Sequence, residues 1–208
     1  PGDLLLFRNT GGNRFERYAE DFGQELGMIT ALGSADLDGD GWTDLVAAGE
    51  YMPITLLRNE QGQFRAEALT DTEGLWNTLK VADFDADGDP DIVLGNVGEN
   101  NFFGEGLTVL IADFDDNGTM EQIACEKTEK GYSPIHEIDN LYQQMPILKK
   151  KFRRYAEFAQ APLEALVPAE KLESALKLQL KERRSLFLRN EAGHLQAEAL
   201  PKAAQYSS

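Results

Sequence analysis

Residues 36–50 read DLDGDGWTDLVAAGE, and residues 83–97 nearly repeat them as DFDADGDPDIVLGNV. A third copy, DFDDNGTMEQIACEK, follows at residues 113–127. A run of acids is usually a solvated surface, but each of these runs leads directly into aliphatic residues that favour a β-strand. The pattern therefore predicts an acidic loop that feeds a strand, used three times.

A second motif recurs in LLFRNTGGNRF, TLLRNEQGQF and LFLRNEAGHL, around Asn9, Asn59 and Asn190. In each copy an apolar run meets Arg-Asn, a turn containing glycine and a further apolar residue, which is typical of a β-hairpin. A strand, an acidic loop, a second strand and a hairpin make a unit of about fifty residues, a period that indicates a propeller or a solenoid. Short strands without helices between them favour propeller blades.

The repeat becomes irregular after Asp83. The third acidic loop follows so soon that the blade between the two loops is expected to have lost most of its outer hairpin. Residues 137–184 carry a helical pattern, and Pro146, Pro162 and Pro168 each suit the first turn of a short helix. One apolar stripe at helical spacing is expected to pack on the blade: Leu141, Met145, Leu148, Phe152 and Tyr155.

The sequence therefore predicts a mainly β fold, a partial β-propeller with a helical insertion. We expect blades with three acidic loops over residues 1–136 and a helical insertion within the third blade over residues 137–184. Residues 185–208 are expected to form the returning hairpin of that blade and the start of the next.

The acidic loops have the spacing of calcium ligands. Positions 1, 3, 5 and 9 carry carboxylates or, once, an amide, position 6 is glycine, and position 7 can turn its carbonyl inward. This pattern predicts three Ca²⁺ sites, with the ligands Asp36, Asp38, Asp40, Trp42 and Asp44; Asp83, Asp85, Asp87, Asp89 and Asp91; and Asp113, Asp115, Asn117, Thr119 and Glu121.

Two other metal interpretations fit the loops less well. An EF-hand needs a bidentate glutamate at position 12 and flanking helices, whereas that position holds Ala47, Leu94 or Ala124 and the flanks are strand-like. Magnesium prefers waters and substrate phosphates to a cage made of protein. Calcium is the expected ion.

These motifs resemble the FG-GAP/VCBS repeats that form integrin-α-like β-propellers. Together with QQMPILKKKFRRYAEFA in the helical region, they also resemble the bacterial ASPIC/UnbV (cartilage acidic protein-like) group. The resemblance implies a calcium-stabilised propeller that is secreted, periplasmic or surface-exposed and acts in adhesion or ligand binding. It implies no shared enzymatic reaction. Such propellers commonly have more blades, so the chain is expected to be a segment of a longer protein.

The charge and hydrophobicity of the chain limit the classes of partner that it can bind. The formal charge of −16 argues against nucleic acid, because binding phosphates needs a basic face. The sequence contains no run of about eighteen apolar residues, so we expect no membrane-spanning helix. The chain opens on the strand-like PGDLLLFRN, so a signal peptide is expected to lie outside this segment. Cys125 is interpreted as a small buried hydrophobe.

Several single residues are candidates for chemistry. His136 opens the helical region and is interpreted as a solvent-facing residue, with acid–base chemistry beside Glu137 or Asp139 as the alternative. His194 lies in a hairpin turn and is interpreted as a surface residue. Trp76 is expected to pack within a blade, and Trp42 is expected to be more exposed. For either side chain, stacking against a sugar ring is the alternative role. Asn100, Asn101, Phe102 and Phe103 form either a plain connection or a ligand-facing loop.

The predicted function is that of a calcium-binding extracytoplasmic module that binds a protein or carbohydrate ligand at the cell surface, without enzymatic activity. The alternative is a scaffold or accessory domain of a polysaccharide-active enzyme, since an acid pair for glycoside cleavage comes together only in the fold. Open blade edges are expected to favour self-association.

Overall fold

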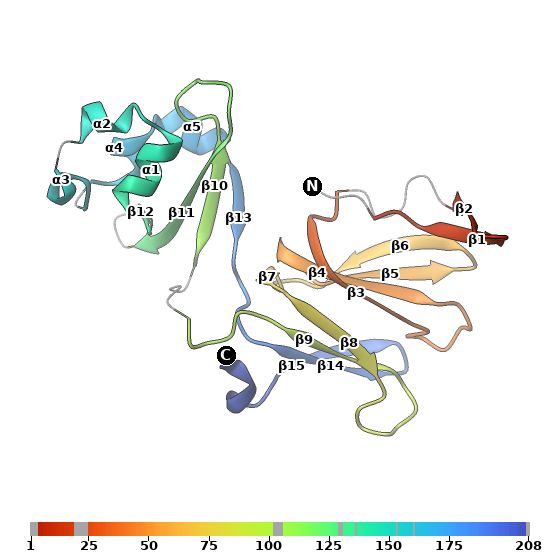
Figure 1. Ribbon diagram of the computed structural model, residues 1–208. Helices are drawn as coiled ribbons and strands as arrows, with labels where there is room; N and C mark the ends of the chain where they lie inside the picture. Colours follow the sequence, from red (N-terminus) through yellow and green to blue (C-terminus); the bar gives the residue numbers. More distant parts are fainter. Residues whose placement is uncertain are drawn as a thin grey trace. The chain divides into compact units, whose positions relative to one another are not determined.

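The computed structural model describes residues 4–18, 25–101, 106–128, 131–135, 137–152, 154–159 and 161–206 (Figure 1). Strands hold 45% and helices 16% of the described residues, in several antiparallel sheets, which confirms the mainly β class. The chain divides into two compact units, one of residues 1–101 with 182–208 and one of residues 102–181. None of the described helices is long and apolar enough to cross a membrane.

The first sheet of the first unit is an antiparallel meander with an acidic loop between its first two strands. Its strand order is β3-β4-β5-β6, and the short β7 pairs with the far end of β4. The bounds are β3 (Met28–Ala35), β4 (Asp44–Met52), β5 (Thr55–Glu60), β6 (Gln63–Ala68) and β7 (Gly74–Leu75). Burial alternates along β3, whereas most of β4 is buried, so β4 is an inner strand. This sheet confirms the predicted order of strand, loop, strand and hairpin.

The second sheet has the same design, but its two halves are far apart in the chain. It consists of β8 (Thr78–Ala82), β9 (Asp91–Gly95), β14 (Leu186–Glu191) and β15 (His194–Ala199), in the order β15-β14-β9-β8. Strand β14 pairs with β9, with Leu186 opposite Leu94. The hairpin around Asn190 therefore completes the second sheet.

Two predictions about this hairpin were wrong. It does not join the strands that flank the third acidic loop, and the second sheet has not lost its hairpin, because residues 96–185 are inserted between β9 and β14. The inserted unit also includes the third acidic loop and its strands, so it extends beyond the predicted helical segment 137–184. Strands pair where their edges and apolar faces match, whatever their distance in the sequence. Because β9 and β14 are far apart in the chain, the sequence pattern did not reveal that they pair.

The two sheets of the first unit share one hydrophobic core. Trp76 is completely buried there, and its indole N–H donates to the Thr72 carbonyl (2.9 Å). Strand β3 passes β8 so closely that a Cβ at Gly33 would lie 2.4 Å from a methyl carbon of Leu79. The core consists of Leu37, Val46, Ala48, Ile54, Leu56, Trp76, Ile92, Leu94, Leu186 and Leu188.

Smaller elements lie near the two ends of the described chain. The predicted hairpin around Asn9 is present as β1 (Phe7–Gly11) paired with β2 (Arg14–Arg17), and both strands are exposed. The 3₁₀ helix η1 (Lys202–Gln205) is tied to the second sheet through Gln205, whose side chain accepts from the Ser185 N–H (2.7 Å). The Arg8 guanidinium lies over the Tyr18 ring.

The second unit is a four-stranded sheet with short helices packed on it (Figure 1). The strand order is β12-β11-β10-β13, with β10 (Thr108–Ala112), β11 (Glu121–Thr128), β12 (Gly131–Pro134) and β13 (Leu176–Gln179). The helices are α1 (Ile138–Gln144), α2 (Leu148–Lys151), α3 (Tyr155–Ala159), α4 (Leu163–Leu166) and α5 (Ala169–Ser174). Pro162 and Pro168 stand at the N-caps of α4 and α5, and Pro146 stands just before α2, close to the predicted positions.

Four of the five stripe residues pack as predicted. Leu141, Met145, Leu148 and Phe152 are buried in the core of the second unit, which also contains residues of β10 and β11. The prediction for Tyr155 was wrong, since 67% of it is exposed. Helix α2 ends at Lys151 and the chain is extended at Phe152, so the helical phase is lost before Tyr155.

Candidate metal centre

The three acidic loops occupy equivalent places, because each joins the first two strands of a sheet: β3 to β4, β8 to β9, and β10 to β11. The predicted sharp turn at position 6 is present, with a positive φ at Gly41, Gly88 and Gly118. Position 4 is also left-handed, although only the first loop has glycine there, and this strain was not predicted. The residues at position 4 are Gly39, Ala86 and Asp116.

The first acid of each loop accepts hydrogen bonds from the loop's own backbone. Asp36 accepts from the N–H groups of Gly39 and Gly41, each at 2.9 Å. Asp83 and Asp113 repeat this pattern, with Oδ2 accepting from Gly88 (3.1 Å) and Gly118 (2.9 Å) respectively. The loop backbone therefore holds the first carboxylate in a fixed place.

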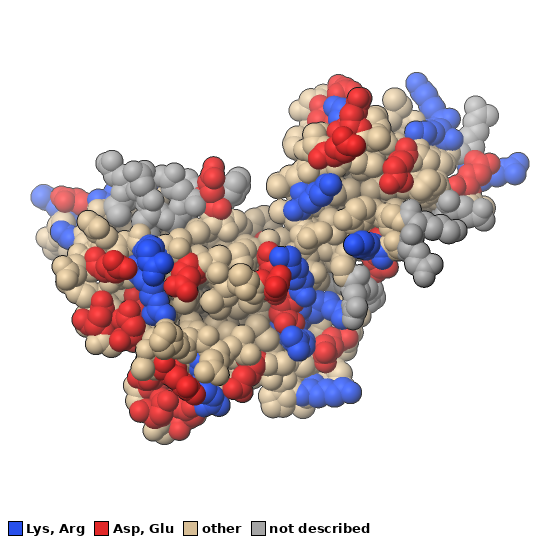
Figure 2. Space-filling model, turned by 180° about the vertical axis from the view of Figure 1, so that it is seen from behind, with Lys and Arg blue, Asp and Glu red and all other residues tan. Residues whose placement is uncertain are grey.

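Carboxylates converge in all three loops. In each loop, one oxygen from each of three residues lies within 4.8 Å of the other two. The groups are Asp36, Asp38 and Asp40; Asp83, Asp85 and Asp91; and Asp113, Asp115 and Glu121. Figure 2 shows acidic side chains gathered in separate patches of the surface that it presents. The sequence predicted these residues as ligands, and the fold brings them together.

Other predicted ligands are used within the structure. Asp44 and Asp87 lie outside the three groups. The Asp89 carboxylate points to the β14–β15 turn, where it accepts from the Ala192 N–H (2.8 Å). At position 7, the backbone N–H groups of Trp42 and Thr119 each donate to the side chain at position 5 (2.7 Å). In the first loop that acceptor is Asp40 and in the third it is Asn117.

The acid at position 9 is a buried structural group. Asp44, Asp91 and Glu121 are each at most 2% exposed. Each accepts from the N–H of position 2, which ties the two ends of the loop together. The donors are Leu37 (3.1 Å), Phe84 (3.1 Å) and Phe114 (2.7 Å).

The asparagine of the Arg-Asn motif links its hairpin to the acidic loop, a role that the sequence reading missed. The Asn59 N–H donates to Asp44 (2.8 Å), and its side-chain amide donates to the Thr43 carbonyl (2.9 Å). Its side-chain oxygen accepts from the Gly62 N–H (2.7 Å) and so closes the turn. Asn190 makes the equivalent bonds with Asp91, Pro90 and Gly193. A sequence signal for this role exists only at Asn59, whose motif directly follows the first acidic loop, because residues 96–185 separate the Asn190 motif from the second loop.

Acid crowding is greatest in the second loop. Loss of hydration raises the pKa of Asp85, and the charges of Asp87 and Asp91 raise it further. The Arg189 guanidinium forms an ion pair with Asp85 and acts in the opposite direction. A cation bound among these carboxylates would relieve their repulsion.

The third loop offers a direct test of whether a cation fits. Asp115 Oδ1 is buried and has no hydrogen-bond partner among the described residues, a costly arrangement for a carboxylate oxygen. It belongs to the group with Asp113 and Glu121. A set of carboxylate oxygens is the donor chemistry that Ca²⁺ prefers, so the residues present fit this ion.

The remaining candidate residues that the structure describes lie in surroundings typical of core or surface residues. Cys125 is completely buried, and burial raises the pKa of its thiol to about 12, as suits a core residue. His194 is exposed at the start of β15, and 43% of Trp42 is exposed. His136, Phe102 and Phe103 lie outside the described residues.

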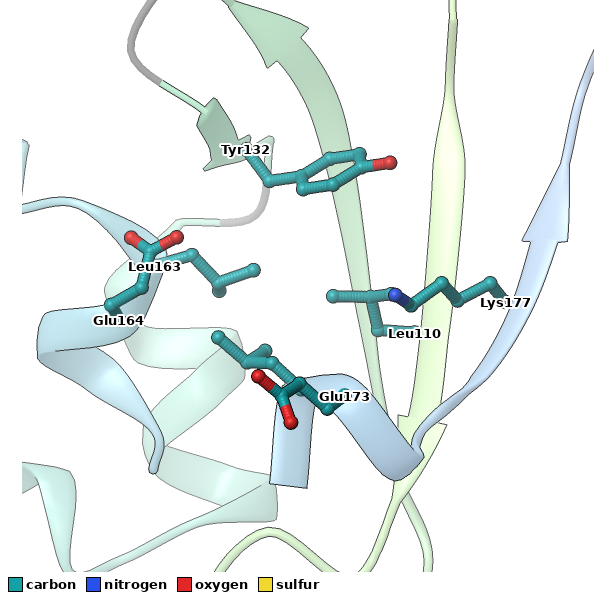
Figure 3. Close-up of a pocket in the computed structure, with 7 residues that line it drawn as sticks. Leu110, Tyr132, Leu163, Glu164, Glu173 and Lys177 are labelled. Atoms are coloured by element: carbon teal, nitrogen blue, oxygen red, sulfur yellow. The ribbon is translucent and has the colours of Figure 1, made fainter. Parts of the chain in front are cut away.

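Cavities formed by described residues of the second unit include a smaller and a larger one. Figure 3 shows the smaller one, of about 180 Å³, where Leu110 and Leu163 form the apolar wall beside Tyr132 and Lys177. It is smaller than the roughly 300–1,000 Å³ of most ligand pockets. The larger cavity, of about 400 Å³, adjoins the third acidic loop and is lined by Phe114, Asp115, Asp116, Ile147, Leu148, Lys150, Lys151, Leu166 and Pro168.

Comparison with known families supports the repeat assignment. Residues 36–94 match the family model of the FG-GAP-like repeat. The match begins at the first acid of the first loop and ends within β9, so it spans the first two acidic loops. No match was found among curated proteins or among solved structures. The predicted resemblance to FG-GAP repeats is confirmed for this segment.

Proposed function

We propose that this chain is a calcium-binding interaction module, built from FG-GAP/VCBS blades of a longer propeller and acting outside the cytoplasm. The convergence of carboxylates in three equivalent loops is the observation that carries this proposal. Repeats of the FG-GAP type are found in extracellular modules for ligand binding and adhesion. The residues of the three groups would hold Ca²⁺, which would neutralise the acids and rigidify each loop.

The ligand that we propose is a protein or carbohydrate at the cell surface. Loops on a rigid sheet scaffold are suitable for such contacts, and in this chain the acidic loops stand on buried inner strands. Bound Ca²⁺ would act mainly by fixing loop shape. The ASPIC/UnbV group remains our proposal for the narrower family, on the motifs of the helical region.

Calcium titration calorimetry after removal of metal with EDTA tests this function. We expect three sites with dissociation constants on the order of 10⁻⁴–10⁻³ M, and a higher melting temperature with calcium, since the ion binds the folded state. Asp36→Ala, Asp83→Ala and Asp113→Ala should each remove one site. Glu67→Ala, which changes an exposed acid on β6, is the matched control. Absence of binding heat, together with an unchanged melting temperature, would contradict the proposal.

The enzymatic alternative, a scaffold or accessory domain for polysaccharide cleavage, is tested separately. Glu164 and Glu173 both line the smaller cavity, but a leucine wall and a small volume do not suit a sugar ring. A glycan array reports binding, and an assay for released reducing sugars reports cleavage. We expect no release of reducing sugar, and release that disappears in Glu164→Gln would favour the alternative.

A further inference from the structure

The apolar residue at position 2 of the acidic loop differs sharply in exposure between the three loops. Leu37 is 2% exposed and Phe114 is 3% exposed, whereas Phe84 is 50% exposed. Phe114 is packed in the core of the second unit. Leu37 belongs to the shared core of the two sheets, and its carbonyl lies under the β14–β15 turn. Phe84 packs edge-on against Phe187 (ring centroids 6.2 Å) and leaves half of its surface exposed, where its equivalents are covered.

The cover on the first loop is a hairpin of the neighbouring sheet. The Asn190 side-chain amide donates to the Leu37 carbonyl (2.8 Å), and Arg58 Nη2 donates to the Gly193 carbonyl (2.7 Å). Gly193 lies so close that a Cβ there would be 3.0 Å from the Asp38 Cβ. An Arg-Asn hairpin thus recognises an acidic loop through an amide, a guanidinium and a close glycine contact.

The first sheet carries a matching hairpin with room beside it. Asn59 makes the same bonds as Asn190 within its own sheet, but in the described part of the chain its amide reaches no neighbouring acidic loop. A cavity of about 250 Å³ lies beside it, between the β1–β2 hairpin and the β5–β6 turn. It is lined by Leu6, Phe7, Arg8, Tyr18, Trp42, Asn59, Gly62 and Phe64.

We infer that the second acidic loop of one copy of this chain docks onto the β5–β6 hairpin of another copy, with Phe84 entering this cavity. In the seated pair, Asn59 of one copy would donate to the Phe84 carbonyl of the other, as Asn190 does to Leu37. Arg189 would reach the Gly62 carbonyl, as Arg58 reaches Gly193. The surfaces are different on the two sides of the contact, so association is head-to-tail.

Tyr18 sets the strength of this contact. Its hydroxyl lies over Gly62, 2.5 Å from where a Cβ would be, in the place that Asp38 takes over Gly193. An incoming loop has to move the Tyr18 ring aside. We therefore expect association that is weak in the native chain and about fivefold tighter in Tyr18→Ala, a change of about 1 kcal/mol.

Two surface variants test the head-to-tail arrangement on the whole chain. Phe84→Asp disables the loop side and Phe7→Asp disables the cavity side, so each variant alone should be monomeric in light scattering after size exclusion. An equimolar mixture retains one intact pair of surfaces and should form a dimer that does not grow further. Phe15→Asp changes an aromatic side chain on the same hairpin, 63% exposed and outside the cavity lining, and should associate like the native chain.

Circular dichroism confirms that each variant is folded before its mass is measured. A native chain that stays monomeric at high concentration overturns the inference. So does an associating native chain whose two disabled variants remain monomeric when mixed, because the association would then use another surface. Association lost equally in Phe15→Asp would also overturn it.

Discussion

The two units of the molecule support the same acidic loop by different means. In the first unit, Asp44 and Asp91 each accept the N–H of a hairpin asparagine. In the second unit Glu121 replaces the aspartate, and its second oxygen accepts from the Thr119 hydroxyl within the loop (3.1 Å). Helices then share the core that buries Phe114. The loop is the constant element, and its structural support is interchangeable.

Breaking the support in the first unit should have the largest effect. Asp44→Ala leaves the buried N–H of Leu37 and the part-buried N–H of Asn59 without their acceptor. It also removes the nearer charge partner of Arg58 (3.3 Å) and leaves only the more distant Asp38 (3.9 Å) in the described part of the chain. Loss of a buried charge partner costs about 3–5 kcal/mol of unfolding free energy. Denaturant titration in EDTA measures this without any contribution from metal.

Asp36→Ala is the matched control for Asp44→Ala, since both remove an acid from one loop. Among the described residues, Asp36 accepts from the backbone N–H groups of Gly39 and Gly41, which water can reach. In EDTA its loss should cost much less. Similar losses in the two variants would mean that position 9 has no special structural role.

The helical support of the second unit should be the next most sensitive. Phe152→Ala removes a ring that contacts Phe158 edge-on and packs in the core, and a truncation of this kind costs about 3 kcal/mol. Hydrogen exchange should accelerate in α1 and α2 and remain unchanged in β4 and β9. Tyr155→Ala, at an exposed position, removes a solvent-exposed hydrogen bond to Asp139 (2.9 Å) and should change exchange in α1 and α2 much less. Rapid exchange across 141–152 in the native chain would contradict packing of these helices.

The length of the acid at position 9 sharpens the comparison further. Glu121→Asp shortens the side chain that accepts from the Phe114 N–H. In the described part of the second unit, no hairpin asparagine bonds to this acid and could compensate. We expect a loss of about 1–2 kcal/mol, the cost of one unsatisfied buried donor, and weaker calcium binding at the third site. Thermal unfolding and calcium titration measure the two effects. An unchanged third site would show that the extra methylene is not needed.

The smallest effect should come from position 7 of the second loop. Asp89→Ala removes one hydrogen bond to the Ala192 N–H and should cost less than about 1 kcal/mol, with calcium affinity nearly unchanged. Asp83→Ala, which removes a member of the converging group, should lose the site. Calcium titration of both variants measures the affinity of the second site. Equal losses of calcium affinity in the two variants would contradict the ligand assignment.

The sequence was sufficient for the local features. The acidic loops and all three Arg-Asn hairpins were predictable because turns, glycines and alternating strands are encoded within about ten residues. Position 6 was predicted to turn sharply, since glycine stands there in every loop. The stripe from Leu141 to Phe152 was predictable for the same reason, whereas Tyr155 was misplaced because two helix ends intervene.

Non-local features could not be predicted from local patterns. Pairing of β14 with β9 depends on matching edges across residues 96–185, and no local signal announces it. The structural role of Asp44, which lies outside the converging group of its loop, was also hidden. Asp40 and Asp44 are the same residue type four positions apart, and only burial against Asn59 and Arg58 distinguishes Asp44.

The insertion between β9 and β14 has a consequence for how the chain folds. During synthesis, β9 emerges well before β14, so the second sheet has to wait for its outer hairpin with an inner edge unpaired. Closing a long flexible loop is entropically unfavourable. Here, however, β13 pairs with β10, and the Leu180 N–H donates to the Leu107 carbonyl (2.9 Å), so the inserted unit begins and ends side by side. Once that unit has folded, it acts as a short link, and the late strands reach the waiting edge at a much smaller entropic cost.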